Sequence, residues 1–210
     1  QAAKDVMEQA NRVVALFDFD GTITSRDSLL PFLWQLFGPL KLTGFAVLMS
    51  PLLLGYLLRI IPNGIAKERL LGRMLGGMAL ARLQAEAERF AAHTLPALVR
   101  PESAERIAWH QAQGHRVIIV SASLELYLKP WATSLGIDDV LATRLAEERG
   151  RAASSFEGVN CFGEEKAQRI RDYLGDVSVL ELYAYGDSKG DTQMLAMADH
   201  AHYRGKLIEQ

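Results

Sequence analysis

Short apolar runs alternate with longer amphipathic stretches along most of the chain. The runs are rich in β-branched residues and predict buried strands at residues 13–20, 115–123, 140–146, 179–187 and, more weakly, 200–203. The amphipathic stretches are bounded by proline or glycine and predict helices at residues 101–114, 123–136 and 163–175. Strands that alternate with helices favour an α/β fold, in which a mostly parallel sheet is covered on both faces.

Residues 24–100 break this alternation, because no convincing strand occurs there. The pattern predicts helices at residues 27–37, one or two within 40–61, and more within 65–100, with a break near Gly76-Gly77. We therefore predict a core domain of residues 1–23 and 101–210 and an inserted helical subdomain of residues 24–100. Residues 150–160 also break the alternation and are expected to form a hairpin or a loop.

The insert contains an apolar segment, residues 42–58, which holds no charged residue and is flanked by Lys41 and Arg59. It is slightly shorter than the roughly 20 residues that span a bilayer, and Pro51 would kink it. A single span would also separate the first strand from the rest of the sheet. The alternatives are packing inside the insert, contact with a membrane interface, and cover for an apolar substrate tail.

Composition and charge narrow the function classes. The 210 residues include one cysteine, Cys161, so a disulfide framework is excluded and a reducing, cytoplasmic location is expected. Residues 1–11 lack the pattern of a secretory signal. The net charge is −2, but residues 24–100 carry nine Lys/Arg against four Asp/Glu. A basic insert suits an anionic substrate or the inner face of a membrane, whereas nucleic acid is not expected, because no basic cluster contains interleaved aromatic residues.

Polar side chains follow three of the predicted strands where those strands end. Asp18, Asp20 and Thr22 follow the first strand, residues 121–123 (Ser-Ala-Ser) follow the second, and residues 186–191 (GDSKGD) follow a later one. Lys166 falls in the first turn of the helix predicted at residues 163–175. Because ligands of parallel sheets bind beyond the carboxyl ends of the strands, we expect these groups to meet at one site.

The expected site combines acids with groups that bind phosphate. Four aspartates without a convergent histidine or cysteine favour a hard cation, and Mg²⁺ fits best because it prefers carboxylate, carbonyl and water oxygens. The hydroxyls of Ser121 and Thr22 and the amides at helix starts suit a phosphate. Lys166 adds positive charge. Carboxylates repel a phosphate dianion unless cations offset them, so the two halves of the site require each other.

The first two aspartates suggest a reaction. Asp18 can attack phosphorus in line and form an aspartyl-phosphate, which divides a slow hydrolysis into two easier steps. Asp20 lies on the same side of an extended segment and can protonate the leaving oxygen, then deprotonate the attacking water. A carboxyl group with the usual pKa of about 3.9 is too acidic for this role. We therefore expect a bound phosphate and Asp18 to raise the pKa of Asp20.

In order along the chain, DFDGT, a serine after the second strand, a lysine and GDSKGD resemble the motifs of the haloacid dehalogenase (HAD) superfamily of hydrolases. The resemblance covers nearly the whole chain. It implies a Rossmann-like core, Mg²⁺, and a helical insert similar to the family's type 1 cap. This arrangement is similar to subfamily IB, which includes phosphoserine phosphatases and the bacterial phosphatidylglycerophosphatase C type.

The resemblance also implies roles for individual residues. Asp18 and Asp187 would bind the metal through their side chains and Asp20 through its backbone carbonyl, with Asp191 supporting them. The phosphoryl group is expected to be held by Thr22, Ser121, Ala122 and Lys166. An acid at position 20 favours rapid dephosphorylation, so a phosphatase is expected rather than an ion pump or a dehalogenase, with a phosphomutase as the less favoured alternative.

The substrate is approached through the cap. Asp27 occupies the position at which phosphoserine phosphatases carry a longer acid, a glutamate that meets the substrate's amino group, and Trp34 and Arg73 are further candidates for substrate contact. The apolar segment with basic flanks favours a lipid phosphate such as phosphatidylglycerophosphate, because burying a tail gains about 0.8 kcal/mol per methylene. The alternatives are phosphoserine or another small phosphate ester, and a non-catalytic HAD fold that binds a membrane or a partner. The sequence makes no prediction of the oligomeric state.

Overall fold

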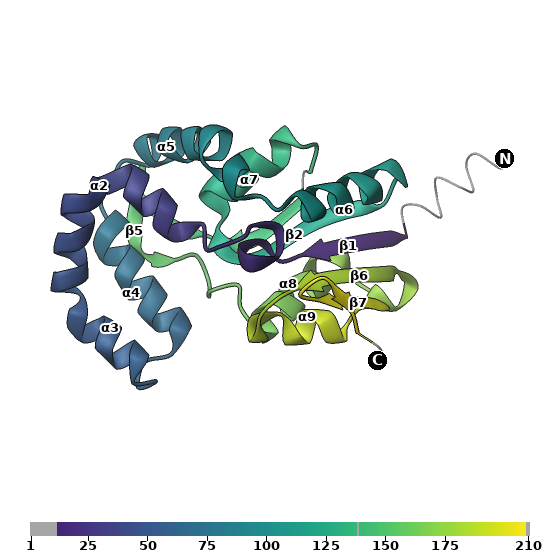
Figure 1. Cartoon of the computed structure of the whole chain (residues 1–210). Helices are drawn as coiled ribbons and strands as arrows, with labels where there is room; N and C mark the ends of the chain where they lie inside the picture. Colours follow the sequence, from purple (N-terminus) through teal and green to yellow (C-terminus); the bar gives the residue numbers. More distant parts are fainter. Residues whose placement is uncertain (1–11, 138, 209–210) are drawn as a thin grey trace.

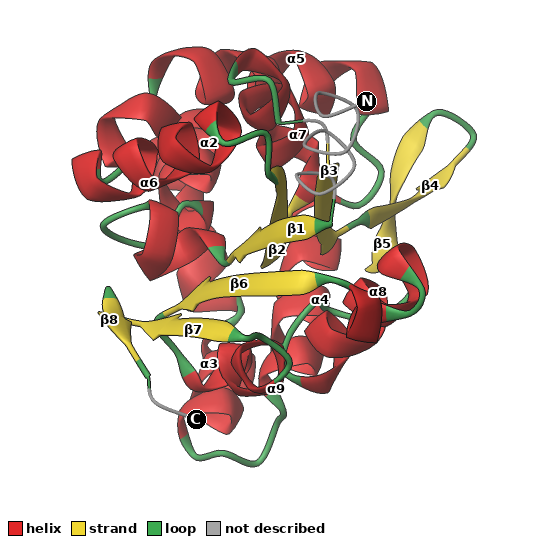
Figure 2. Cartoon of the chain, turned by 90° about the vertical axis from the view of Figure 1, so that its right-hand side faces the viewer, coloured by secondary structure: helices red, strands yellow, loops and turns green. Residues whose placement is uncertain are grey.

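A mostly parallel sheet lies at the centre of the computed structural model, which describes residues 12–137 and 139–208 (Figure 1). Its strand order is β3–β2–β1–β6–β7–β8, and β8 is antiparallel to β7 (Figure 2). The strands are β1 (Val13–Phe17), β2 (Arg116–Leu124), β3 (Asp139–Thr143), β6 (Glu181–Gly186), β7 (His200–Tyr203) and β8 (Lys206–Leu207). The predicted α/β fold is confirmed. The predictions made for residues 1–11 lie outside the described residues.

Helices cover both faces of the sheet. Helices α6 (Pro101–Ala112) and α7 (Glu125–Ser134) lie on one face, and α8 (Glu164–Leu174) and α9 (Thr192–Ala196) lie on the other (Figure 1). The alternation along β1 fixes this arrangement, because successive side chains of a strand point to opposite faces. Ala15 and Phe17 belong to the apolar cluster that includes α6 and α7, whereas Val14 and Leu16 belong to the cluster with α8 and α9.

The chain between β1 and α6 forms a helical cap at one end of the sheet (Figure 1). Its helices are α2 (Leu29–Leu48), α3 (Ser50–Leu57), α4 (Asn63–Leu75) and α5 (Leu80–His93). Gly38 has a φ of 72° and breaks α2 just before Pro39, as the gap between the two predicted helices indicates. The break predicted near Gly76-Gly77 separates α4 from α5.

Two crossing segments connect the cap with the sheet. A tight turn, Phe19–Ile23, follows β1, and a 3-10 turn, Leu95–Leu98, precedes α6. Thr24 and Val99 form an isolated antiparallel bridge, and the backbone N–H of Arg100 donates to the carbonyl of Ile23 at 2.8 Å. The point where the chain leaves the sheet and the point where it returns are therefore fastened side by side.

A β-hairpin of β4 (Leu145–Glu148) and β5 (Arg151–Phe156) leaves the main sheet and packs against α4 of the cap. The strand predicted at residues 140–146 is present as β3, but its predicted end is wrong, because β3 ends at Thr143 and β4 pairs in a separate two-stranded sheet. Residues 150–160, for which a hairpin or a loop was expected, contain only the second strand of this hairpin, followed by a loop. It contacts the cap closely, because a Cβ added to Gly72 in α4 would lie 2.1 Å from the carbonyl oxygen of Ser154.

Helix α3 exposes its apolar side chains. Leu57 is 73% exposed and Leu54 is 55% exposed, and α3 contains no fully buried residue. Packing inside the insert therefore does not account for this part of residues 42–58. In the described part of the chain, no single helix has the length and composition of a membrane span; the pair α2 and α3, bent by 66° at its break, passes that test only when taken together.

Candidate active site

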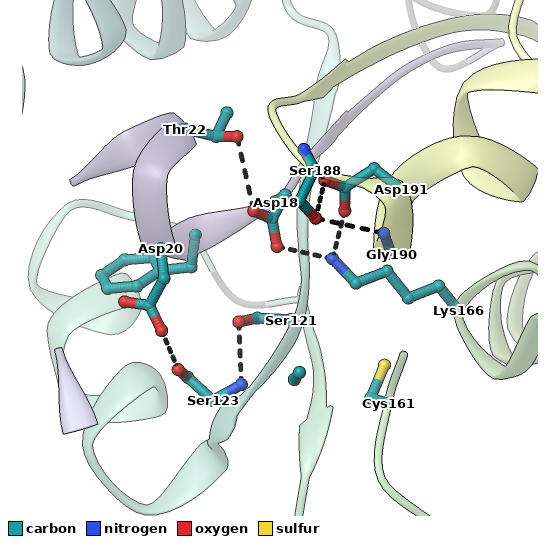
Figure 3. A network of polar contacts seen from close by, with 12 residues as sticks. Asp18, Asp20, Thr22, Ser121, Ser123, Cys161, Lys166, Ser188, Gly190 and Asp191 are labelled. Carbon is teal, nitrogen blue, oxygen red and sulfur yellow. Dashed lines mark hydrogen bonds and ion pairs between the residues drawn. The ribbon is translucent and has the colours of Figure 1, made fainter. Parts of the chain in front are cut away.

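Asp18 lies at the carboxyl end of β1, where the strand meets the mouth of the cap. Its backbone N–H donates to the carbonyl of Tyr185 on β6 at 2.9 Å, so the pairing of β1 and β6 continues into the loop. Its side chain is buried and lies between two partners (Figure 3). Lys166 donates to Oδ1 at 2.5 Å and the Thr22 hydroxyl donates to Oδ2 at 3.4 Å. The predicted partners Asp18, Thr22 and Lys166 thus meet.

Lys166 lies in the first turn of α8 and is fully buried. It also contacts Asp191, whose Oδ1 accepts from the ammonium group at 2.6 Å. The other oxygen of Asp191 accepts hydrogen bonds from the backbone N–H groups of Asp187 and Ser188 and from the Ser188 hydroxyl. Asp191 therefore holds the turn that carries Asp187 and, at the same time, positions the lysine.

Three carboxylates gather beside this lysine. Oxygens of Asp18, Asp187 and Asp191 all lie within 4.8 Å of one another. Thr22 connects two of them, because its hydroxyl lies 3.3 Å from Asp187 Oδ1 and 3.4 Å from Asp18 Oδ2. Gly21 permits the approach: its φ is 88°, and a Cβ added there would lie 2.3 Å from Asp187 Oδ2.

The carboxylate cluster fits a hard divalent cation. Lys166 is the cation that Asp18 and Asp191 contact, and buried charge without a partner is costly. The donors are oxygens only, which suits Mg²⁺ rather than a softer metal. Asp191 carries the most hydrogen bonds of the three, because Lys166 contacts its Oδ1 and two N–H groups and the Ser188 hydroxyl donate to its Oδ2, so Asp18 and Asp187 are the better candidates to bind such an ion.

Asp20 is turned away from the cluster, toward the cap and the end of β2 (Figure 3). Its Oδ1 accepts from the backbone N–H of Ser28 at 2.9 Å, and its Oδ2 accepts from the Ser123 hydroxyl. Ser28 immediately precedes α2. The Asp20 carboxyl group therefore links the start of the cap to the sheet. This agrees with a metal role for Asp20 that was predicted for its backbone carbonyl and not for its side chain.

The pKa values of both acids are raised. Burial raises the pKa of Asp18 to about 7, with Asp191 adding to the shift and Lys166 opposing it. Burial also raises the pKa of Asp20, and the second cause is the carboxylate of Asp27. Asp18, which was expected to raise the pKa of Asp20, is not among the largest causes of this shift. A raised pKa of Asp20 suits a group that gives and takes a proton near neutral pH.

Ser121, Ala122 and Ser123 lie within the irregular carboxyl-terminal part of β2. Ser121 is buried, and its Oγ accepts from the backbone N–H of Ser123 at 3.0 Å. The carbonyl of Ala122 accepts from Nζ of Lys67, a cap residue in α4, at 2.7 Å. Burial lowers the pKa of Lys67. This lysine therefore brings a cation from the cap to the phosphate-binding turn predicted from the sequence.

A cavity of about 380 Å³ joins these groups to the cap. It is lined on the sheet side by Asp18, Asp20, Ser121, Ala122, Lys166 and Ser188, and on the cap side by Asp27, Leu29, Leu52, Leu53, Tyr56, Asn63, Ala66, Lys67 and Leu70, with Asn160 and Phe162 completing it. The floor is charged and the wall contributed by α3 is apolar. The cavity therefore has a polar end, which suits a charged group, and an apolar side, which suits hydrocarbon.

The three predicted cap residues lie in different surroundings. Asp27 lines the cavity, but its Oδ1 accepts from the backbone N–H groups of Leu29 and Leu30 and so caps α2. Trp34 is 55% exposed and does not line the cavity. Arg73 lines a separate surface depression on the far side of α4. The structure therefore does not bring Trp34 and Arg73 to the cavity.

Sequence reasoning missed Lys67 and Ser123 as site residues. Lys67 lies among several basic residues of the insert, and no local signal separates it from Arg69 or Arg73. Ser123 lies in the Ser-Ala-Ser turn, so its place beside Ser121 was a usable signal. Its contact with Asp20 joins residues 103 positions apart and follows from the fold rather than from the motif.

Comparison with known proteins identifies the class. The model of the haloacid dehalogenase-like hydrolase family matches residues 15–196 of this chain. The chain therefore belongs to the haloacid dehalogenase-like hydrolases. This confirms the family predicted from DFDGT and GDSKGD.

Individual relatives narrow this class. The chain is 37% identical to protein CicA of Caulobacter vibrioides over 195 residues, which cover 91% of this chain and 86% of that protein. It is 32% identical to the probable phosphatase Rv3661 of Mycobacterium tuberculosis over 195 residues, covering 90% of this chain and 68% of that protein. With the family match, these relatives place the chain among the HAD-type phosphatases.

Solved structures share the fold. A protein of unknown function from Bordetella pertussis superposes with a TM-score of 0.78 at 24% identity, covering 91% of this chain and 89% of that one. A phosphoserine phosphatase determined as a phospho-aspartyl intermediate analogue superposes with a TM-score of 0.60 at 17% identity, covering 91% and 85%. At these identities the likeness shows the fold, including its helical cap.

Proposed function

We propose that this chain is a Mg²⁺-dependent phosphomonoester hydrolase of HAD subfamily IB, that it acts through an aspartyl-phosphate on Asp18, and that its substrate carries an apolar tail. The observation that carries the proposal is the 380 Å³ cavity. At one end it contains Asp18 beside Lys166, and its wall includes Leu52, Leu53 and Tyr56 of α3.

Asp18 acts as the nucleophile in this proposal. It is fixed by Lys166 and Thr22, which hold one oxygen each and orient the carboxylate toward the cavity. Attack on phosphorus forms the bond from Asp18 to phosphorus while the bond from phosphorus to the ester oxygen breaks. Lys166, Ser121 and the backbone around Ala122 bind the phosphoryl oxygens, which gain charge during transfer.

Asp20 acts as the general acid and base. In its protonated form it gives its proton to the leaving alcohol, and as a carboxylate it then takes a proton from the water that attacks the aspartyl-phosphate. The Ser28 N–H and the Ser123 hydroxyl orient its carboxyl group for both steps. Because Ser28 belongs to the start of the cap, the position of the cap and the position of this acid are linked.

Asp18, Asp187 and the backbone carbonyl of Asp20 would hold Mg²⁺, with Asp191 supporting the turn. When bound, the ion supplies charge that offsets the repulsion between the carboxylates and the phosphate. The same positive charge favours the ionised form of Asp18, whose pKa of about 7 would otherwise leave part of the population protonated at neutral pH.

The position of helix α3 favours the proposal of a lipid-like substrate, because this helix is apolar on two sides. Leu52, Leu53 and Tyr56 line the cavity, while Leu54 and Leu57 point to solvent. Lys41 and Arg59 flank the segment and suit an anionic membrane surface. We infer that α3 contacts the membrane interface, and that the tail of a phosphomonoester such as phosphatidylglycerophosphate lies along the inner side of this helix.

The proposal is tested by comparing hydrolysis of phosphatidylglycerophosphate in mixed micelles with hydrolysis of phosphoserine, each with Mg²⁺ and with chelator. We expect the lipid ester to be preferred in kcat/KM and both activities to require Mg²⁺. A Leu53→Ser variant should lose activity on the lipid, while Leu40→Ser, an exposed position in α2 that does not line the cavity, serves as the matched control.

Two outcomes would refute the proposal. A preference for phosphoserine would leave a small-metabolite phosphatase, a function that the position of Asp27 at the cavity also suits. Flotation of the chain with liposomes, without turnover of any phosphate ester, would leave a membrane-binding protein with a HAD fold.

A further inference from the structure

A second cavity of about 480 Å³ lies behind the loop that follows β1. None of the residues that line the first cavity lines this one. Gly21, Thr22 and Asp187 form the wall between the cavity and the acid cluster. The rest of the lining comes from the ends of β1 and β6, from α6 and the residue before it, and from β7 and the turn between β7 and β8.

The lining of this second cavity is basic. Arg100 directly precedes α6 and Arg106 lies within it, whereas Arg204 comes from the turn between β7 and β8 and His202 comes from β7. Glu102 and Asp187 are the acids of the lining. Among the residues that the structure describes, none of the three arginines forms a salt bridge, and the lining contains three arginines against two acids. The lining therefore carries net positive charge before any proton binds to His202.

The arginines are held in place without being neutralised. Arg100 donates from Nε to the carbonyl of Thr24 at 3.2 Å, and Arg204 donates from Nε to the carbonyl of Asp187 at 3.0 Å. Arg106 lies over the ring of Trp109, with its guanidinium carbon 5.9 Å from the ring centroid. Among the described residues, none accepts a hydrogen bond from the terminal guanidinium nitrogens of Arg100 or Arg204. These nitrogens are the ones that form two-point contacts with oxyanions.

The backbone of the β7–β8 turn supports this arrangement. Arg204 has a φ of 51° and Gly205 a φ of 75°, the left-handed pair of a tight hairpin turn. The backbone N–H of Arg204 donates to the carbonyl of Gly186 at 2.8 Å. The turn is therefore fastened to the end of β6, and the Arg204 side chain lies directly beside the turn that carries Asp187.

We propose that this second cavity is a binding site for a phosphate group, distinct from the cavity that contains Asp18. Three arginines in the lining of one cavity match the several oxygens and the double charge of a phosphate better than the single charge of a carboxylate. The group belongs either to free phosphate or to an organic phosphate, for which the cavity has room. Bound here, the anion adds negative charge beside Asp187 and favours retention of a cation at the acid cluster.

The direct test is a crystal of the chain soaked in tungstate, a heavy analogue of phosphate, with anomalous scattering used to locate it. We expect a tungstate ion within hydrogen-bond distance of Arg100, Arg106 or Arg204, whether or not another occupies the first cavity. Tungstate found only in the first cavity, or nowhere, would overturn the proposal. Failure of the proposed reaction at Asp18 would leave this result unchanged.

A binding measurement in solution distinguishes a phosphate site from a position that holds an adventitious ion only. Calorimetric titrations with inorganic phosphate and with ADP distinguish free from organic phosphate, and we expect one of the two to bind with a stoichiometry that falls by one site in Arg106→Gln/Arg204→Gln. Arg82→Gln, an exposed arginine of α5, is the matched control and should keep wild-type binding. Equal weakening in the control and in the double variant, or saturation only at the soaking concentration, would overturn the proposal.

Discussion

Replacing Lys166 with methionine tests the charge balance of the acid cluster. Lys166 is 2% exposed, and its ammonium group lies 2.5 Å from Asp18 Oδ1 and 2.6 Å from Asp191 Oδ1. Methionine keeps an unbranched apolar side chain of similar length but removes the charge. The two carboxylates, 9% and 0% exposed at their side chains, then lose their shared cation.

The magnitude follows from the burial of these groups. Removing one partner of a buried ion pair costs about 3–5 kcal/mol. Asp18 limits this cost, because a carboxyl group whose pKa is already raised to about 7 can bind a proton when the lysine is gone. Lys166 favours the ionised form of Asp18, so its loss raises the pKa of Asp18 further. We therefore expect a loss of about 3–5 kcal/mol at pH 8 and a smaller loss at pH 5.5, where Asp18 is protonated.

Urea unfolding, followed by circular dichroism with chelator present, measures the free energy of unfolding at both pH values. Lys129→Met, an exposed lysine of α7, is the matched control and should change stability by less than about 0.5 kcal/mol. Added Mg²⁺ should restore part of the loss in Lys166→Met. A loss below about 1 kcal/mol at pH 8, or a loss that is larger at pH 5.5, would show that Lys166 does not balance buried carboxylates.

Three further changes have expected outcomes. Gly21→Ala should weaken Mg²⁺ binding in a thermal-shift titration, because the new Cβ would displace Asp187. The matched control is Gly77→Ala, where φ is a similar 79° but the new Cβ meets open space; it should lose comparable stability and keep its Mg²⁺ affinity. Between pH 7 and pH 4, the free energy of unfolding of the wild type should fall by up to about 3 kcal/mol more than that of His110→Gln. The reason is that burial lowers the pKa of His110 to about 4, so the unfolded chain takes up the proton first. The same pH dependence in both proteins would contradict this. Asp20→Asn should lower kcat at least about 100-fold, measured with a phosphate ester, and an unchanged kcat would remove it as the acid.

The core of the site could be predicted because its residues follow strand ends. Asp18, Asp187 and Ser121 come after β1, β6 and within the end of β2, and a parallel sheet brings such positions to one edge whatever lies between them. Lys166 joins them because the first turn of α8 faces the same edge. The separation along the chain is irrelevant once the strand order is fixed.

Contacts between the cap and the sheet could not be predicted in this way. The bond between Lys67 and Ala122 depends on the angle at which α4 meets β2, which no periodicity reports. The same holds for Asp27, whose carboxylate raises the pKa of Asp20 where Asp18 was expected to do so. Apolar periodicity identified α3 as a helix, but it did not show that Leu54 and Leu57 lack cover.

The hairpin of β4 and β5 illustrates a related limit. Leu145 continues the apolar run of β3, so the letters alone favour one strand, whereas the chain turns away at Arg144 and pairs Leu145 with Phe156. Which sheet a short apolar run joins is decided by its neighbours in space. Here α4 offers a surface on which Gly72 leaves room for the hairpin backbone.

The proposed reaction requires that Asp18 is phosphorylated during turnover. The direct measurement is acid quenching of the enzyme with a ³²P-labelled phosphate ester and Mg²⁺, followed by peptide mapping of the retained label. We expect an alkali-labile acyl phosphate on Asp18 that is absent from Asp18→Asn and from samples with chelator. Steady turnover with no label on the protein, or label on any residue other than Asp18, would contradict it.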